Sequence, residues 1–233
     1  MAVFEIIITD ITCYGTLYCV AGWEHRRRQM IRPEPPTASN TSEGSRFWNE
    51  HHVGPGRPFS IGNIIRFDAS PPPNDFPFPH ATEDCLVNLS RPIDIVGNLA
   101  FSQIARAVAG GISSSLEAAF DGGLVRVASG KAYVAGGHFG RSLGAIEIAP
   151  SRLQLYVDTY GDKQRLRCRI GIGNNLYDLS VPADAARTRW KAAGIDVLQN
   201  DAKGSTRIHV RVGLSRPFGE HPCYAQVNGL YFL

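Results

Sequence analysis

Short apolar runs, repeatedly interrupted by glycine, proline, asparagine and aspartate, constrain the fold of this chain more than any other feature. They have the length and the turn-forming borders that are typical of β-strands. The clearest of these runs are residues 4–9, 17–22, 61–68, 143–148, 164–172 and 176–181. Asn174-Asn175 is a good hairpin turn between the last two. About five short strands with little helix in each half predict a mainly β (α+β) protein built of two small closed barrels.

Helical periodicity is found in two segments. Apolar residues recur at helical spacing from Leu99 to Ile112, so that residues 97–123 are predicted to form a helical connector. The segment Pro182–Gly194 is predicted to be one helix, because proline is favoured at a helix start and glycine at its end.

The expected domains follow from this order of strands and helices. An N-terminal barrel covers residues 1–96 and carries a long loop at 33–58 that is rich in Pro, Ser, Asn, Gly and His. The connector at 97–123 leads to a C-terminal barrel over 124–233. Because no apolar run approaches 18 residues and the first ten residues do not resemble a secretory signal, we expect a cytoplasmic protein without a membrane partner.

The sequence contains no pattern typical of a cofactor or metal site. Its five cysteines are scattered without C-x-x-C spacing, which favours buried, reduced thiols over disulfides or zinc ligands. The common phosphate-binding, dinucleotide-binding, hydrolase and zinc-protease motifs are not found. We therefore expect no cofactor, no metal and no catalytic residue.

Arginine dominates the basic residues, with 20 Arg against 4 Lys. Its planar guanidinium forms forked hydrogen bonds to phosphate and stacks on bases. A GC-rich genome would also favour arginine codons, so only the distribution of the arginines can indicate a function. Residues 152–216 contain 12 basic and 6 acidic residues, a larger excess than the net charge of +3 for the whole chain.

Alternation along two predicted strands gives the strongest functional pattern. On each strand, three polar or basic side chains share one face, and three apolar side chains share the other. If these strands are neighbours, one sheet face carries a dense positive charge suited to nucleic-acid phosphate; the alternative is an ordinary solvated face. The basic faces consist of Arg165, Arg167 and Arg169 on one strand and Arg207, His209 and Arg211 on the other.

Cations interleaved with aromatic residues form a second cluster in the first half. This combination suits single-stranded nucleic acid, because aromatic rings stack on bases while arginines neutralise phosphates. A merely exposed basic loop and tryptophans of the core explain the pattern equally. The cluster consists of Trp23, Arg26, Arg27, Arg28, Arg32 and Trp48, with Tyr14, Tyr156 and Tyr160 as further candidates for stacking.

His80, Glu83 and Asp84 form the best candidate for an enzymatic site. A histidine with two nearby carboxylates is suited to acid–base chemistry or to a metal. However, adjacent residues such as Glu83 and Asp84 cannot share one face of a strand, and no second ligand cluster is evident. A loop with turn-forming polar groups is the simpler interpretation.

Several short strings resemble the bacterial dual OB-containing domain family over nearly the whole chain, from about Phe4 to Leu233. They are Ile8-Thr9-Asp10-Ile11-Thr12, Tyr18-Cys19-Val20-Ala21-Gly22, Ile31-Arg32-Pro33, Pro79-His80 with Glu83-Asp84, Leu214-Ser215-Arg216-Pro217-Phe218 and Gln226-Val227-Asn228-Gly229-Leu230-Tyr231. The resemblance implies two OB-like barrels and a nucleic-acid role in bacterial defence. Its matching positions include Arg32 and Arg216, each followed by proline, and it brings no catalytic residues.

These observations together favour a non-catalytic nucleic-acid-binding protein of a bacterial defence or mobile-element system, with single-stranded DNA or RNA as the favoured ligand. One alternative is an adaptor that binds a partner nuclease or helicase, because OB-type barrels bind proteins as well and a fold does not fix a function. Another is a nucleotide- or nucleic-acid-processing enzyme that uses His80, Glu83 and Asp84.

Overall fold

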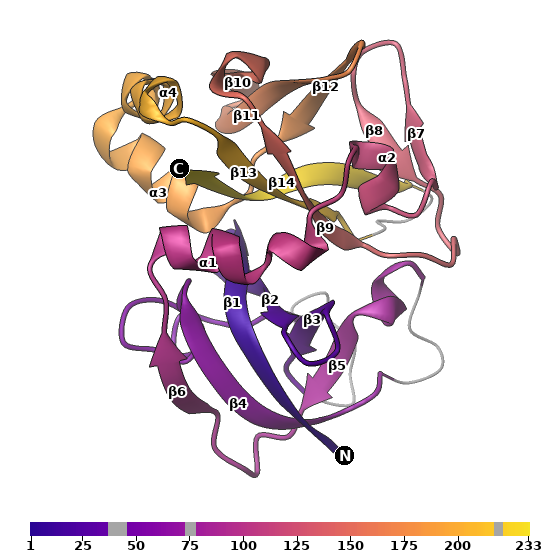
Figure 1. Cartoon of the computed structure of the whole chain (residues 1–233), viewed down its shortest axis with the longest axis vertical. Coiled ribbons are helices and arrows are strands. Elements are labelled where there is room, and N and C mark those ends of the chain that lie inside the picture. Colours follow the sequence, from indigo (N-terminus) through magenta and orange to yellow (C-terminus); the bar gives the residue numbers. More distant parts are fainter. Residues whose placement is uncertain (37–45, 73–77, 217–220) are drawn as a thin grey trace. The chain divides into compact units, whose positions relative to one another are not determined.

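A computed structural model describes residues 1–36, 46–72, 78–216 and 221–233. The chain divides into two compact units, each with its own β-sheet (Figure 1). Unit 1 comprises Met1–Pro77 with Ala81–Gly111, and unit 2 comprises Phe78–His80 with Ile112–Leu233. The predicted connector at 97–123 is therefore divided between the units, and the predicted loop at 33–58 lies partly outside the described residues.

Unit 1 is built around a ring of five strands, and a sixth strand lies at its edge. Its helices are the α-helix α1 (Phe101–Ala107) and the short 3₁₀ segment η3 (Ala109–Gly111), and η2 (His80–Thr82) crosses from one unit to the other. The pairing order is β1-β2-β3-β5-β4, with β4 pairing back to β1, while β6 pairs with β4. The strands are β1 (Ala2–Tyr14), β2 (Leu17–Glu24), β3 (Gln29–Glu34), β4 (Asn63–Ser70), β5 (Asp84–Val87) and β6 (Asp94–Asn98).

The long first strand closes this ring because it bends. A register shift between Ile8 and Asp10 marks a bulge in its pairing with β2, and bulges increase local twist and bending. The core side chains change phase there, from Ile6 and Ile8 before the bulge to Ile11 after it. The N-terminal part of β1 thereby pairs with β4, and the later part pairs with β2.

The connection from β3 to β4 supplies part of the core of unit 1. Trp48, Val53 and Phe59 are buried with the strand residues, although they lie in irregular backbone. Trp48 is held by a hydrogen bond from its indole Nε1 to the backbone oxygen of Pro33 (2.8 Å), and its ring packs on Phe59 with centroids 4.5 Å apart. This part of the predicted loop is therefore a structural element of the barrel.

Unit 2 repeats the same order of strands. Its sheet runs β10-β11-β12-β14-β13-β9, and β7 pairs with β8, which pairs with β14. Its helices are α2 (Leu116–Ala119), η4 (Pro150–Arg152), α3 (Asp184–Ala193) and α4 (Ile195–Gly204). The strands are β7 (Leu124–Arg126), β8 (Ala132–Val134), β9 (Leu143–Ile148), β10 (Leu153–Tyr160), β11 (Lys163–Ile172), β12 (Asn175–Ser180), β13 (Ile208–Leu214) and β14 (Cys223–Phe232).

In unit 2 the consecutive strands β9 and β10 together take the place of β1. The short turn η4, which begins with Pro150, separates them, so that β9 pairs with β13 and β10 pairs with β11. In both units the third and fifth strands of the ring pair in parallel. Two five-stranded barrels with this connectivity confirm the predicted mainly β fold with OB-like barrels.

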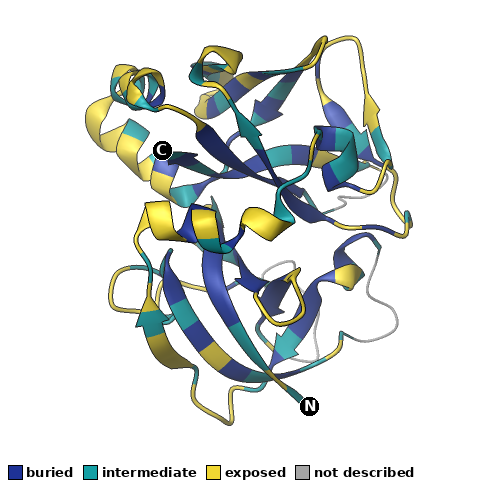
Figure 2. Cartoon of the chain, viewed as in Figure 1, coloured by how far each residue is buried: buried dark blue, intermediate teal, exposed yellow. Residues whose placement is uncertain are grey.

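Helices fill the connection between the third and fourth ring strands of unit 2. Gly194 ends α3 with a φ of 85°, as predicted, but the chain then enters a second helix, α4, which was not predicted. Ala186 of α3 and Leu198 and Ala202 of α4 belong to the core of this unit. The alternation of buried and exposed residues along the strands is visible in Figure 2. No helix of the described residues is long and apolar enough to cross a membrane.

Candidate nucleic-acid interface

The outward face of β10, β11 and β12 brings together the arginines predicted on one strand. Leu166, Cys168 and Ile170 of β11 are buried in the core of unit 2. Alternation then directs the intervening arginines away from the core. We call this surface the arginine face, and it consists of Tyr156, Asp158 and Tyr160 on β10, Lys163, Arg165, Arg167 and Arg169 on β11, and Asp178 on β12.

Register determines which of these side chains are neighbours. Asp158 is the partner of Arg165 across β10 and β11, and Asp178 is the partner of Arg169 across β11 and β12. Opposite charges in such pairs stabilise a sheet, whereas like charges destabilise it. The repulsion expected along a row of arginines is therefore reduced by carboxylates of the neighbouring strands.

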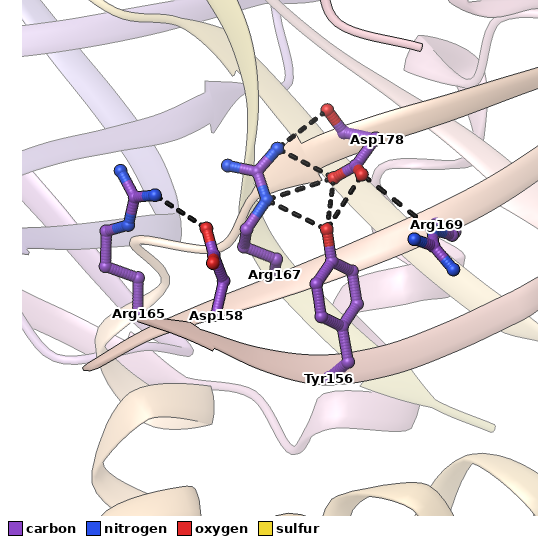
Figure 3. Close-up of polar contacts among 6 residues, drawn as sticks. All are labelled: Tyr156, Asp158, Arg165, Arg167, Arg169 and Asp178. Atoms are coloured by element: carbon purple, nitrogen blue, oxygen red, sulfur yellow. Dashed lines mark hydrogen bonds and ion pairs between the residues drawn. The ribbon is translucent and has the colours of Figure 1, made fainter. Parts of the chain in front are cut away.

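The three arginines differ in how they are held (Figure 3). Arg165 forms an exposed ion pair with Asp158, at 2.6 Å between Nη2 and Oδ2. Arg167 is nearly enclosed, and its Nη2 donates to Oδ1 of Asp178 at 2.7 Å. Arg169 lies farther from that carboxylate, with 3.8 Å between its Nε and Oδ2.

Tyrosine rings lie beneath the two more exposed arginines. The guanidinium carbon of Arg165 lies 4.6 Å from the ring centroid of Tyr160, and that of Arg169 lies 5.1 Å from the ring centroid of Tyr156. Both distances are within the range of cation–π interactions. A stacked guanidinium keeps one flat face toward the ring and leaves the other available to a base or a phosphate.

Mutual hydrogen bonds shift the pKa values of Asp178 and Tyr156 in opposite directions. Burial raises the pKa of a carboxyl group, but hydrogen bonds from Tyr156 and Arg167 outweigh it and lower the pKa of Asp178. Burial and the hydrogen bond to Asp178 raise the pKa of Tyr156. At neutral pH Asp178 is therefore ionised while Tyr156 is neutral and donates a hydrogen bond to it.

The turn between β2 and β3 of unit 1 exposes another group of arginines. We call Arg26, Arg27 and Arg28 the basic turn, and all three are exposed, as predicted for a basic loop. The guanidinium of Arg27 lies 3.7 Å from a carboxylate oxygen of Glu24 and 4.5 Å from the ring centroid of Phe4.

Three other residues of the predicted cluster in unit 1 are buried, which contradicts their expected surface role. The indoles of Trp23 and Trp48 are in the interior, so neither is placed to stack on a base. Arg32 is also enclosed, and its Nη1 lies 2.6 Å from Oδ1 of Asp84. Burial works against the charge of Arg32, but the carboxylate of Asp84 raises its pKa.

The second predicted arginine strand does not extend the arginine face. Two strands, β12 and β14, separate β11 from β13, so the condition that the two strands are neighbours is not met. Both faces of β13 are buried, including His209 and Arg211. The ring of His209 stacks on Tyr231 with centroids 5.6 Å apart, and burial lowers its pKa to about 3. Arg207 is exposed beside the strand, 3.9 Å from Glu147.

The remaining candidates lie apart from the arginine face. Arg216 is half-buried just after β13. His80, Glu83 and Asp84 are all buried, with Nε2 of His80 at 3.2 Å from the backbone oxygen of Leu214. His80 belongs to unit 2, whereas Glu83 and Asp84 belong to unit 1. Within the described parts of the chain, no group of three or more histidine, cysteine or acidic residues is arranged to hold a metal ion.

Sequence reasoning missed the two carboxylates of the arginine face, Asp158 and Asp178. Ile172 pairs with Asn175, so the hairpin turn lies at Gly173 and Asn174, one residue before the predicted Asn174-Asn175, and the predicted turn therefore gives the wrong register of β12 against β11. The observed turn places Asp178 opposite Arg169.

The family model described as "Dual OB-containing domain" matches residues 4–230, nearly the whole chain. A search of curated proteins finds no significant match.

Proposed function

Because the chain belongs to the dual OB-containing domain family, whose barrels are a fold that commonly binds nucleic acid, we propose that it is a non-catalytic nucleic-acid-binding protein. The arginine face is the proposed binding surface. We further propose that single-stranded DNA or RNA is its preferred ligand.

One observation carries this proposal: Arg165 and Arg169 project from the second strand of an OB ring while each is stacked on a tyrosine. The face formed by the second and third strands is where OB folds bind oligonucleotides. Single strands are bound without sequence preference by cationic grooves in combination with aromatic stacking. The face combines both kinds of group.

The carboxylates of the face set a limit on its affinity. Asp158 and Asp178 offset part of the arginine charge, so the surface engages few phosphates at a time. For single strands, the logarithm of the binding constant falls with the logarithm of salt concentration at a slope of about −0.7 for each phosphate neutralised. We expect a shallow slope, corresponding to two or three phosphates.

The test is fluorescence anisotropy with labelled single-stranded DNA, RNA and duplex DNA over a series of salt concentrations. Arg165→Ala and Arg169→Ala should each weaken binding and reduce the slope by about 0.7. Arg189→Ala is the matched control, because Arg189 is an equally exposed, ion-paired arginine on α3 of the same unit. Absence of saturable binding at low salt, or equal weakening by the control, would contradict the proposal.

The basic turn is proposed as a secondary contact of unit 1. Its three arginines are exposed, and Arg27 lies over the ring of Phe4, so the turn supplies mainly positive charge to the phosphates of a ligand. Arg26→Ala should lower affinity for single strands and duplexes by the same factor, measured in the same anisotropy series. A loss confined to single strands would contradict this assignment.

A protein partner is the second candidate for the same surface. Arginine and tyrosine are the residues enriched at the centres of protein interfaces, and the face is rich in both. Such a partner would be a nuclease or helicase of a bacterial defence or mobile-element system, in line with the family resemblance. Stoichiometric capture of a partner that Arg169→Ala abolishes, with no affinity for oligonucleotides, would favour this function over the first.

A further inference from the structure

Asp178 lies at the centre of the contacts within the arginine face (Figure 3). The hydroxyl of Tyr156 lies 2.7 and 2.8 Å from its two carboxylate oxygens. The Nε and Nη2 of Arg167 lie 3.0 and 2.7 Å from Oδ1, and Nη2 also contacts the backbone oxygen of Asp178 at 3.1 Å. Arg167 and Tyr156 also contact each other directly, since Nε of Arg167 lies 3.0 Å from the hydroxyl of Tyr156.

The backbone of Asp178 is fixed from the opposite side by the turn between β7 and β8. Its amide donates to the carbonyl of Gly130 at 2.8 Å. Gly130 has a φ of +85°, and a Cβ atom at this position would lie 3.2 Å from the amide nitrogen of Asp178. The turn therefore needs glycine, and its carbonyl holds the backbone of β12 at Asp178.

The arginines that contact Asp178 are exposed to different extents. The side chain of Arg167 is 12% exposed and forms hydrogen bonds to both Asp178 and Tyr156. The side chain of Arg169 is 47% exposed, and its only carboxylate neighbour among the described residues is the distant Asp178. The guanidinium of Arg167 is thus engaged by Asp178 and Tyr156. Arg169 lies outside these hydrogen bonds, with its guanidinium over the ring of Tyr156.

We propose that Asp178 is a positioning residue for nucleic-acid binding: it holds Tyr156 and Arg167 so that Arg169 lies flat on the Tyr156 ring and presents its outer face to an unpaired base. This inference rests on the proposed function and adds the base-stacking contact to it. Double-stranded nucleic acid keeps its bases stacked on one another, so this contact selects single strands.

Asp158 weakens binding of the same ligand, whereas Asp178 supports it. Its carboxylate contacts Arg165 in an exposed pair, at a site that a phosphate would otherwise take. Removing its charge frees Arg165 for phosphate without disturbing a network. Two aspartates of equal charge on one face therefore affect binding in opposite directions, whereas a purely electrostatic face would bind more tightly when either one is neutralised.

The experiment compares Asp178→Asn and Asp158→Asn with the wild-type chain. Anisotropy is measured with an unstructured single-stranded DNA 15-mer and with a duplex of the same sequence. Asp158→Asn should tighten binding to both by up to about fivefold. Asp178→Asn should weaken binding to the single strand about fivefold or more and leave the duplex nearly unchanged. Glu5→Gln in unit 1 is the control for a lost carboxylate in an exposed cross-strand pair, and it should change neither affinity.

Tyr156→Phe provides a second variant that leaves every charge in place and keeps the ring under Arg169. It removes only the hydroxyl through which Asp178 and Arg167 hold that ring. We expect weaker single-strand binding with an unchanged salt slope, and this variant decides the question if Asp178→Asn does not fold.

Wild-type affinity or tighter binding in a folded Asp178→Asn would overturn the positioning role, while saturable wild-type binding would still support the proposed function. Unchanged binding by Tyr156→Phe would overturn it as well. Absence of wild-type binding to any oligonucleotide would overturn both.

Discussion

Arg32 and Asp84 form a buried ion pair between direct register partners on the parallel strands β3 and β5. The distance between Nη1 and Oδ1 is 2.6 Å, and the two side chains are 3% and 0% exposed. The parallel pairing of the third and fifth strands is part of the ring of unit 1. The pair therefore lies where the barrel depends on a correct strand register.

Replacing Asp84 by asparagine should destabilise the protein strongly. The substitution keeps the shape of the side chain but removes the charge that lies 2.6 Å from the buried guanidinium of Arg32. Loss of one partner of a buried pair costs about 3–5 kcal/mol in the free energy of unfolding. Urea denaturation measures this loss. Glu5→Gln, which breaks the exposed pair of Glu5 with Arg66, should cost at most about 1 kcal/mol, and equal losses would contradict the structural role of the buried pair.

Trp48 and Tyr160 should respond to alanine substitution in opposite ways. Trp48 is buried in the core of unit 1, and Trp48→Ala should cost about 3–5 kcal/mol of stability. Tyr160 is 71% exposed beneath the guanidinium of Arg165, so that Tyr160→Ala should change stability by about 0.5 kcal/mol or less. We expect Tyr160→Ala to weaken oligonucleotide binding. Thermal denaturation and anisotropy separate the two effects, and a stable Trp48→Ala with impaired binding would restore the base-stacking role predicted for this tryptophan.

The contrast between these residues shows what the sequence pattern could and could not predict. Alternation along β11 correctly separated its arginines from its three apolar residues, Leu166, Cys168 and Ile170, which lie in the core because one side of that strand is covered and the other is solvated. The same reasoning failed on β13, where His209 and Arg211 are buried along with their apolar neighbours. A period of two gives the two faces of a strand, but it does not tell whether the second face is covered.

Strand order and the second helix were missed for different reasons. Strand order could not be predicted because β14 follows β13 in the chain but lies between β12 and β13 in the sheet, a pairing that no local pattern indicates. The helix α4 was missed because Gly194 was interpreted as the end of helical structure. Ile195, Leu198 and Ala202 are spaced as one apolar helix face directly after that glycine, a signal that could have predicted the helix.

Gly62 should tolerate no side chain, because the space beside it is taken by backbone. Its φ is +90°, and a Cβ atom there would lie 2.2 Å from the backbone oxygen of Leu99. Gly56 has a φ of +73°, and no atom lies within 4 Å of a Cβ built there. The substitution Gly56→Ala therefore measures only the cost of placing a side chain on a left-handed backbone. Gly56→Ala should lose about 1–2 kcal/mol, and Gly62→Ala should lose at least about 1 kcal/mol more. Equal losses in urea denaturation would show that the close approach to Leu99 is absorbed without cost.

Acid should remove the contribution of Asp178 to stability. Its pKa in the folded protein lies below the ordinary value of 3.8, chiefly because hydrogen bonds from Tyr156 and Arg167 outweigh the effect of burial. The unfolded chain therefore binds a proton on Asp178 more readily than the folded protein does. The stabilisation is fully present above the unfolded pKa and is lost as the pH falls below about 4 through the folded pKa.

Glu117 and Asp121 also have lowered pKa values, so the acid destabilisation of the whole protein contains their contributions. Comparison of the wild type with Asp178→Asn removes these shared contributions. We expect the difference in the free energy of unfolding between the two proteins, measured with urea, to be constant from pH 7 to pH 5 and to shrink at pH 3. A difference that stays the same at pH 3 would mean that the contribution of Asp178 to stability does not depend on its ionised form.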